Sequence, residues 1–311
     1  MKNLMKIIIK LLPSFATVLA LTAGAQGAFV DPTWSARVAG LGGAYTALSD
    51  DAAGIFYNPA GGVGMMRKEI LLSYSKLLTG LETVNISLGQ VAYAHPIGKH
   101  SVLGIGWGRF QAVDLYREDT VLVSYAQSLK PLFASYSGDL SLGISAKFLT
   151  RSFTMTDRTS NDPVFSGGGR KSAAAIDLHV FSVPEPVLLP GLSLGLTARS
   201  VNSPNIGLQA DENLPMEIVG GILYRWNNFA FPIDVASRKG KLNPSFGAEM
   251  NLMNGAMSFR MGSDINQIST GLGISHDLTQ NFKIAFEYAF LMPLTVEGTT
   301  GSHRATFGIK F

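Results

Sequence analysis

The stretch Phe282-Lys283-Ile284-Ala285-Phe286-Glu287-Tyr288-Ala289-Phe290 alternates large apolar residues with charged or small ones. Successive side chains of a β-strand point to opposite faces, whereas a helix would mix the two sets of residues on its surface. This stretch therefore predicts a strand that has one apolar face and one polar or small-residue face.

The same alternation recurs from Glu69 onward, in segments of roughly ten residues that turn signals separate. Within one of these segments, Gly89-Gln90 interrupts the alternation, and we expect a β-bulge there. The segments number fourteen, an even number such as bacterial outer-membrane barrels have. The expected strands are residues 69–77, 85–97, 101–112, 119–129, 139–153, 172–183, 191–203, 215–226, 228–238, 244–253, 256–265, 268–277, 281–292 and 302–311.

The composition agrees with a chain that crosses a membrane by strands. Hydrophobic residues make up 46% of the sequence and charged residues 15%, whereas charged residues usually reach about 25% in soluble proteins. After residue 25 there is no run of about 18 apolar residues that could form a spanning helix. In lipid, each backbone polar group must pair within the protein, and a chain of strands achieves this only as a closed barrel. The sequence therefore predicts an all-β fold, a 14-stranded antiparallel transmembrane barrel formed by residues 69–311.

A soluble β-sandwich is the alternative, because its strands would also alternate. Three features favour the barrel: apolar faces rich in Phe, Tyr, Leu and Met, connections that alternate in length, and an export signal. The longer connections, 154–171 and 202–214, are expected on the extracellular side, and the short ones, 227–228 and 254–255, on the periplasmic side. Connections 131–138 and 184–191 are longer than this scheme predicts for the periplasmic side.

Residues 1–25 have the organisation of a secretory signal peptide. Lys2, Lys6 and Lys10 precede an apolar stretch, and Ala23-Gly24-Ala25 supplies small residues for cleavage near Ala25. A membrane anchor is the alternative, which the shortness of the apolar stretch disfavours. The sequence has no cysteine, so neither a disulfide nor a lipoprotein anchor is expected. The formal net charge of +3 is not concentrated in a basic run, so no nucleic-acid partner is expected.

The last expected strand ends on an aromatic residue. Phe307, Ile309 and Phe311 share its apolar face, and Phe311 is the last residue of the sequence. This arrangement resembles the terminal signal by which outer-membrane barrels engage their insertion machinery. We therefore expect location in the bacterial outer membrane, with membrane lipid and the insertion machinery as partners.

Residues 26–68 do not alternate and are rich in small residues, which allow a backbone to pack closely inside another structure. We expect this segment to be a plug in the mouth of the barrel. A flexible periplasmic tail is the alternative, but it would be more polar. The residues that form a pattern within the segment are Gly40, Gly42, Gly43, Asp50, Asp51, Asn58, Pro59, Ala60 and Gly61.

This pattern resembles the amino-terminal hatch of the FadL-like outer-membrane barrels, a superfamily that includes the FadL/TodX transporters of hydrophobic compounds. The phrase Leu41-Gly42-Gly43-Ala44-Tyr45 and the short loops are more similar to the PorV/PorQ group. The resemblance is specific at residues 36–61 and architectural beyond them. It implies a fourteen-stranded barrel with a hatch, and the short loops differ from the long outer loops that gather ligand in the transporters.

Alternation also assigns charged residues to the interior of the barrel. One interpretation is a paired network that braces the barrel and the plug. A sharper hypothesis is that Asp50 and Asp51 bind interior arginines or lysines, with Arg199, Arg260 and Arg304 as the first candidates. The charged or titratable residues expected to face the interior are Lys147, Asp177, His179, Arg199, Glu217, Arg225, Asp234, Glu249, Arg260, Lys283, Glu287, Arg304 and Lys310.

The sequence favours no enzyme. Asp177 and His179 share one strand face, but no nucleophile is singled out for them to activate. The five histidines show no spacing typical of metal ligands, so no metal and no cofactor are expected.

Three functions remain open. The resemblance to the hatch implies passage of hydrophobic small molecules, of the long-chain fatty acid type, across the outer membrane. The PorV/PorQ-like phrasing implies a non-conducting accessory of secretion or outer-membrane assembly, which would bind a secreted-protein partner. A general porin is the third possibility, and a plug opposes it.

Overall fold

The computed structural model describes residues 28–29, 33–82, 84–132, 138–157, 159, 162–184 and 190–311. The expected signal peptide, residues 1–25, and most of connections 131–138 and 184–191 lie outside these ranges. Within them, fourteen strands form: β1 (Glu69–Thr79), β2 (Ile86–Ile97), β3 (Ser101–Ala112), β4 (Tyr116–Ser128), β5 (Asp139–Phe153), β6 (Arg170–Val183), β7 (Leu192–Arg199), β8 (Glu217–Trp226), β9 (Phe229–Arg238), β10 (Lys241–Leu252), β11 (Met257–Asp264), β12 (Gln267–Thr279), β13 (Phe282–Pro293) and β14 (Gly301–Lys310).

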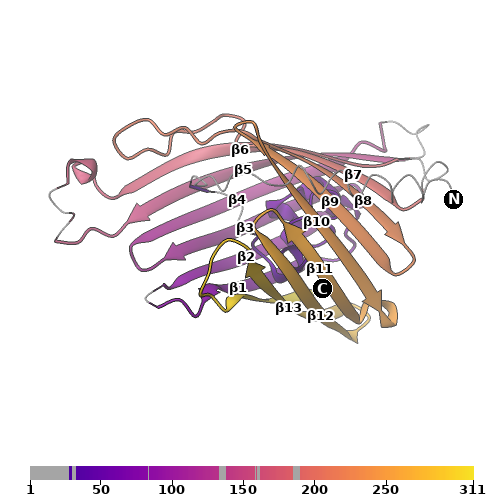
Figure 1. Cartoon of the computed structure of the whole chain (residues 1–311). Coiled ribbons are helices and arrows are strands. Elements are labelled where there is room, and N and C mark those ends of the chain that lie inside the picture. Colours follow the sequence, from indigo (N-terminus) through magenta and orange to yellow (C-terminus); the bar gives the residue numbers. More distant parts are fainter. Residues whose placement is uncertain are drawn as a thin grey trace.

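The strands close into a barrel (Figure 1). Each pairs antiparallel with its neighbours in the sequence, and β1 pairs with β14 so that Glu69 lies opposite Lys310. Backbone hydrogen bonds between Lys68 and Phe311 extend this closing pair by one residue. The prediction of a closed barrel of fourteen antiparallel strands is confirmed. Separately, none of the helices in the described ranges has the length and apolarity needed to cross a membrane.

The expected bulge at Gly89-Gln90 was wrong. The pairings of β2 with β1 and with β3 both run through these residues without a shift of register. The alternation is interrupted there because Leu88 and Gln90 are buried on the inner face, 1% and 2% exposed, while the intervening Gly89 faces outward. The shifts of register in the described strands fall instead at 76–79 of β1 and 277–279 of β12.

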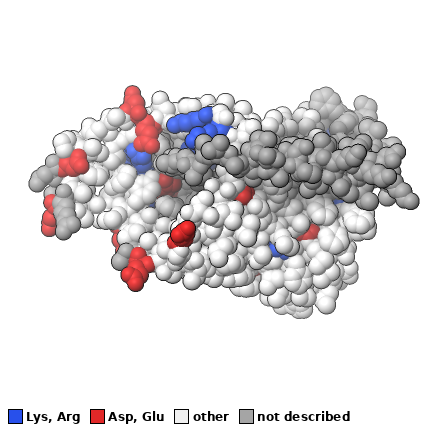
Figure 2. All heavy atoms as spheres, in the orientation of Figure 1, with Lys and Arg blue, Asp and Glu red and all other residues white. Residues whose placement is uncertain are grey.

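The two faces of the wall differ as the alternation predicts. On β13, Phe286 and Met292 are 51% and 41% exposed, whereas Ala289 and Leu291 are 0% and 1% exposed. The outward side chains are large and apolar along the other strands as well. Most of the surface visible in Figure 2 carries neither acidic nor basic side chains, and the charged residues gather mainly toward one end, on the left.

That end carries the longer connections, β5–β6 and β7–β8, and we call it the loop end. The opposite end, where β1 begins and β14 finishes, is the terminal end. A short helix, η3 (Pro163–Phe165), lies in the β5–β6 connection, and η4 (Met253–Gly255) lies in the β10–β11 connection.

Residues 33–64, which we call the N-terminal segment, lie inside the ring of strands (Figure 1). The segment forms α2 (Ala36–Gly40), η1 (Ala52–Phe56) and η2 (Pro59–Gly64). Helix α2 contacts β11–β14, η1 contacts β1–β3, and η2 contacts β2–β6. The segment therefore reaches both sides of the interior, and its buried residues form most of the central apolar core.

Candidate functional site

The glycines of the N-terminal pattern stand where the N-terminal segment meets the wall. A Cβ atom at Gly40 would lie 3.3 Å from the Cα atom of Gly271 on β12. Gly42 has a φ of +66°, and a Cβ atom there would lie 2.7 Å from the carbonyl oxygen of Ser263 on β11. Gly43 also has a positive φ, +91°. Glycine adopts such a backbone without strain and leaves room for a second backbone, so the pattern follows from close packing against β11 and β12.

Polar groups fix the middle of the segment on the opposite wall. The backbone N–H groups of Tyr45 and Thr46 donate to one carboxylate oxygen of Asp234 on β9, at 2.9 and 2.8 Å. The side-chain amide of Asn58 donates to the carbonyl oxygens of Thr46 and of Val180 on β6, both at 2.9 Å. Buried backbone groups need such partners, so these contacts hold the segment in one position.

Asn58 also begins η2, the helix that contains the remaining residues of the pattern. Its side-chain oxygen accepts a hydrogen bond from the Ala60 N–H at 3.2 Å, as a helix N-cap does, and Pro59 takes the first helical position. A Cβ atom at Gly61 would lie 2.9 Å from the Cβ atom of Ser49, so glycine is needed where two parts of the segment touch. Asn58, Pro59, Ala60 and Gly61 thus serve the internal packing of the segment.

Arg37 is the centre of a buried ion-pair network. Its Nε and Nη2 atoms donate to the two carboxylate oxygens of Glu249 on β10, at 2.9 and 3.0 Å. Its Nη1 atom donates to Asp50 at 2.5 Å, to Asp51 at 3.0 Å and to the Tyr45 hydroxyl at 3.1 Å. This forked contact with Glu249 is the geometry that makes arginine–carboxylate pairs specific. One arginine therefore joins three parts of the N-terminal segment to the wall.

The network continues along the wall on both sides. Glu249 also accepts from Arg260 of β11 at 2.7 Å, and Arg260 donates to Glu287 of β13 at 3.0 Å. In the other direction, the second oxygen of Asp50 lies 2.8 Å from Arg225 of β8. Four strands are thereby tied to the N-terminal segment at the terminal end.

The hypothesis that Asp50 and Asp51 bind interior cations holds for Asp50, which pairs with Arg225 of β8, but the three arginines named as first candidates were wrong. The hypothesis named Arg199, Arg260 and Arg304, but the structure pairs both aspartates with the arginine of their own segment, and Asp50 also with a β8 arginine. The error arose because the segment turns back on itself and brings its own cation to the acidic pair.

Sequence reasoning overlooked Arg37, although a signal for it exists. Between residues 33 and 66 it is the single basic residue, and Asp50 and Asp51 are the single acidic ones. A lone arginine among small apolar residues must be paired if it is buried. Burial raises the pKa of Asp51, but the positive charges of Arg37 and Lys310, together with hydrogen bonds from Tyr45 and Arg37, outweigh this effect and hold the pKa below its usual range. The stability that this pair contributes is complete above the ordinary aspartate pKa and is lost as the pH falls through the lowered value.

Other charged residues that were expected in the interior also face it and are paired there. Lys147 lies 2.7 Å from Asp177, and Arg199 lies 3.1 Å from Glu217. Arg304 donates to the Thr33 hydroxyl at 2.8 Å and so binds the N-terminal segment. These pairs fit the interpretation of a network that braces the barrel. Lys283 is less firmly held, since its Nζ atom lies 4.0 Å from Asp277.

A buried hydrogen-bonded chain runs across β5, β6 and β7 to the N-terminal segment. The Thr197 hydroxyl donates to the carbonyl oxygen of Tyr57 at 3.1 Å, and the Nδ1 atom of His179 lies 3.2 Å from that hydroxyl. The Ser145 hydroxyl lies 2.9 Å from the Nε2 atom of His179. The chain satisfies three buried polar side chains and adds another tie between wall and segment.

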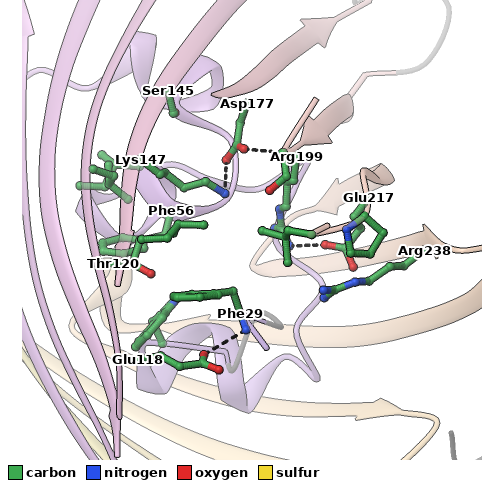
Figure 3. A pocket seen from close by; sticks show the side chains of 17 residues that line it. Phe29, Phe56, Glu118, Thr120, Ser145, Lys147, Asp177, Arg199, Glu217 and Arg238 are labelled. Atoms are coloured by element: carbon green, nitrogen blue, oxygen red, sulfur yellow. Dashed lines mark hydrogen bonds and ion pairs between the residues drawn. The ribbon is translucent and has the colours of Figure 1, made fainter. Parts of the chain in front are cut away.

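A cavity lies between the N-terminal segment and the loop end (Figure 3). It has a volume of about 70 Å³, and we call it the loop-end cavity. Lys147, Arg199 and Arg238 point into it beside the carboxylates of Asp177 and Glu217. A third carboxylate, that of Glu118, also lines the cavity and accepts from the Phe29 N–H at 3.0 Å. Apolar side chains form much of the remaining wall: Phe29, Trp34, Ile55, Phe56, Leu122, Leu149 and Leu214.

Arg238 differs from the other two cations of this cavity. Its Nη2 atom donates to the carbonyl oxygen of Ala28 at 3.2 Å. Among the residues that the structure describes, no carboxylate lies within ion-pair distance of its guanidinium, whereas Lys147 and Arg199 each have one. The cavity thus combines apolar walls with one cation whose charge is not neutralised by a direct partner.

Two larger cavities also lie in the interior. The terminal-end cavity has a volume of about 380 Å³ and is lined by the charged network around Arg37, together with Lys310 and Glu69. A second cavity of about 380 Å³ lies toward the loop end, where it is lined by Gly42, Gly43 and residues of β8–β12. The N-terminal segment lies between the terminal-end cavity and the other two.

The apolar residues of the carboxy-terminal strand face outward. Phe307 and Phe311 are 40% and 42% exposed, and Ile309 pairs with the outward Ile70 of β1. Strand β14 ends at Lys310, one residue earlier than expected, although Phe311 still bonds to Lys68.

Comparison with known proteins gives structural relatives. No protein-family model and no curated protein sequence matches the chain. It is similar in structure to the CymD monoaromatic hydrocarbon channel, with a TM-score of 0.60, 14% identity, and coverage of 91% of this chain and 98% of that one. The Ralstonia pickettii toluene transporter TbuX matches with a TM-score of 0.59 and 14% identity, over 90% of this chain and 99% of that one. A Pseudomonas aeruginosa FadL homologue matches with a TM-score of 0.55 and 9% identity, over 90% of this chain and 98% of that one.

At these identities the likeness concerns the fold. The similarity extends over nearly the whole length of each of these barrels. The chain has the same barrel fold as these three proteins, which is the fold that the resemblance of its amino-terminal pattern implied.

Proposed function

We propose that this protein lies in the bacterial outer membrane and provides a route across it for hydrophobic small molecules. The observation that carries the proposal is the loop-end cavity, which places aromatic and aliphatic side chains beside charged ones in the interior of the barrel. Ligand sites of proteins typically combine apolar walls with a few polar groups that fix orientation. The matched structures include channels for monoaromatic hydrocarbons and a toluene transporter, which supports the same class of ligand.

Arg238 refines the class of ligand. Its guanidinium points into the cavity and has no direct carboxylate partner in the described part of the chain. Arginine binds carboxylates through two parallel hydrogen bonds. A carboxylate beside this cation, with the adjoining part of an apolar chain against the aromatic and aliphatic wall, fits one end of a fatty acid.

In this proposal residues 26–68 act as the plug and residues 69–311 as the barrel. The loop end faces the cell exterior and the terminal end faces the periplasm, after export directed by residues 1–25 with cleavage near Ala25. Ligand enters the loop-end cavity from outside. Further passage then requires the N-terminal segment to shift, because it lies between the loop-end and terminal-end cavities.

Binding can be followed through Trp34, which lines the loop-end cavity. A brominated fatty acid bound in the cavity is expected to quench the fluorescence of Trp34. The quenching that is due to Trp34 should disappear in Trp34→Phe, since the other tryptophans, Trp107 and Trp226, lie on outward-facing strand positions. Thr120→Phe is expected to weaken quenching at least tenfold, because Thr120 lines the same cavity and a ring there fills it. Gln127→Phe, on the outward face of the same strand, is the matched control. Equal quenching by the two phenylalanine variants would contradict the assignment of the cavity.

Insertion into the membrane is expected to depend on Phe311. Deleting this residue removes an exposed aromatic from the outer face and two backbone hydrogen bonds with Lys68 that help to close the barrel. The deletion variant should reach the periplasm but accumulate there, as measured by fractionation of cells and by gel mobility without heating. Normal amounts in the outer membrane would show that Phe311 is not part of an insertion signal.

The alternative is a non-conducting accessory of secretion or assembly, of the PorV/PorQ type. Such a barrel would co-purify with a secretion partner and would not bind the fatty acid. The sequence Leu41-Gly42-Gly43-Ala44-Tyr45 supports this alternative, whereas the apolar side chains of the loop-end cavity support the proposed route.

A further inference from the structure

The outer face of β3 and β4 changes character in one step near the loop end. Trp107 of β3 lies opposite Val121 of β4, and two residues closer to the loop end Arg109 lies opposite Asp119. Residues two apart on a strand share a face, so these pairs follow one another along the outside of the wall. The next pair on this face brings Arg117 of β4 opposite a glutamine of β3. On the outside of the wall, the apolar surface therefore ends at Trp107, and arginines begin one pair closer to the loop end.

The two arginines are held by a single carboxylate. The Nε atom of Arg109 lies 2.7 Å from one oxygen of Asp119, and the Nε atom of Arg117 lies 3.3 Å from the other. The indole N–H of Trp107 donates to Asp119 at 3.2 Å, and the Arg109 guanidinium lies 4.9 Å from the centre of the Trp107 ring.

This cluster carries a net positive charge in an exposed position. Two guanidiniums share one carboxylate, and the side chains of Arg109 and Arg117 are 37% and 45% exposed while Asp119 is 18% exposed. Across the sheet, Arg117 lies opposite Ser152 of β5, which lies opposite the outward Arg170 of β6. In the described part of the chain, Arg170 has no carboxylate within ion-pair distance. We call Arg109, Arg117 and Arg170 with Asp119 the basic rim.

The position and charge of the basic rim point to one kind of partner. Tryptophan is enriched where the hydrocarbon of a membrane meets its headgroups, so the arginines next to Trp107 stand at headgroup level. Guanidinium groups bind phosphate through forked hydrogen bonds, and positive clusters at this level attract anionic headgroups. We propose that the basic rim binds a phosphate group of lipid A, the anionic headgroup of the lipopolysaccharide in the outer leaflet. This inference rests on the proposed outer-membrane location with the loop end outward.

The test uses the whole protein in phosphatidylcholine nanodiscs to which lipid A is added. Binding is measured as lipid A retained per protein after gel filtration, at several lipid A concentrations. The wild type is expected to retain diphosphorylated lipid A at least tenfold more tightly than Arg109→Gln/Arg117→Gln. Arg67→Gln, an exposed arginine that precedes β1 at the opposite end of the barrel, should bind as the wild type does.

Two comparisons keep the test independent of the folding of the variants. Wild-type protein should prefer diphosphorylated lipid A to dephosphorylated lipid A and to phosphatidylglycerol. Arg109→Lys/Arg117→Lys, which keeps the charge but loses the forked geometry, should bind with intermediate strength. The proposal would be overturned if the wild type retained dephosphorylated lipid A or phosphatidylglycerol as well as it retains diphosphorylated lipid A. It would also be overturned if Arg109→Gln/Arg117→Gln bound diphosphorylated lipid A with wild-type affinity.

The result also separates this inference from the proposed transport. The basic rim lies on the outside of the wall, so Arg109→Gln/Arg117→Gln should bind the brominated fatty acid as the wild type does. Loss of lipid A retention with intact fatty-acid binding supports both proposals. Lipid A retention without any fatty-acid binding would support the basic rim and contradict the transport route.

Discussion

Replacing Arg37 with glutamine is expected to lower the free energy of unfolding by about 3–5 kcal/mol, the usual cost of removing one partner of a buried ion pair. The variant leaves Glu249, which is 2% exposed, without its forked partner and removes the contacts of Asp50 and Asp51 with the segment's own cation. The N-terminal segment should then lose its main tie to β10. The conductance of the barrel in planar lipid bilayers should rise, because the segment no longer holds its place between the cavities.

Unfolding in urea and single-channel recording measure the two effects. Arg67→Gln is the matched control, since Arg67 pairs with Asp277 at 3.6 Å on the exposed surface, and such pairs contribute little. Replacing Asp50 and Asp51 together by asparagine should change conductance in the same direction as Arg37→Gln. If conductance stays at the wild-type level in all of these variants, the network does not hold the segment in the lumen.

Gly42→Ala is expected to displace the N-terminal segment from β11 and to open the interior at the loop end. An L-residue at the φ of +66° found here is strained by roughly 1–2 kcal/mol. The added Cβ atom would also lie 2.7 Å from the Ser263 carbonyl oxygen and 2.8 Å from that of Phe246, and both are backbone atoms that cannot move aside cheaply. The total loss of stability should therefore exceed the backbone strain alone.

Two other glycines separate the causes. Gly98 has a φ of +63°, but a Cβ atom added there would meet no atom of the described residues within 4 Å, so Gly98→Ala reports backbone strain alone. Gly64 has no such strain, and an added Cβ atom would again find no described neighbour within 4 Å, so Gly64→Ala should be neutral. Thermal unfolding and limited proteolysis of the segment should rank the three variants with Gly42→Ala as the most affected. Equal effects at Gly42 and Gly98 would show that the contact with β11 contributes nothing.

The strands could be located from the sequence because each has two different environments, and a period of two records them directly. β3 and β5 were predicted with the bounds that the structure has. β7 ends at Arg199 rather than at residue 203 because Ser200 adopts a positive φ of +53° and its N–H donates to Asp177. The side chain of Asn202 then forms hydrogen bonds with the backbone of β6, in place of the backbone pairing of a longer β7. The alternation of residue types does not reveal this replacement.

The candidate site was less predictable than the wall. Alternation placed Arg225, Glu249 and Arg260 in the interior, since facing depends on parity alone. Which of them meet Asp50 depends on the register around the closed barrel and on the path of the N-terminal segment, and neither leaves a periodic trace in the sequence. Arg37 stands out in the sequence as the single basic residue between residues 33 and 66, but its partners appear only when residues 37 and 50 are brought together.

The most direct test of the proposed route is the initial rate of uptake of a radiolabelled fatty acid into liposomes that contain the purified protein, compared with protein-free liposomes. The proposed route predicts a rate well above that of protein-free liposomes, which falls to that background in Thr120→Phe and is retained in Gln127→Phe. A rate equal to that of protein-free liposomes, with the barrel shown to be folded and inserted, would contradict it.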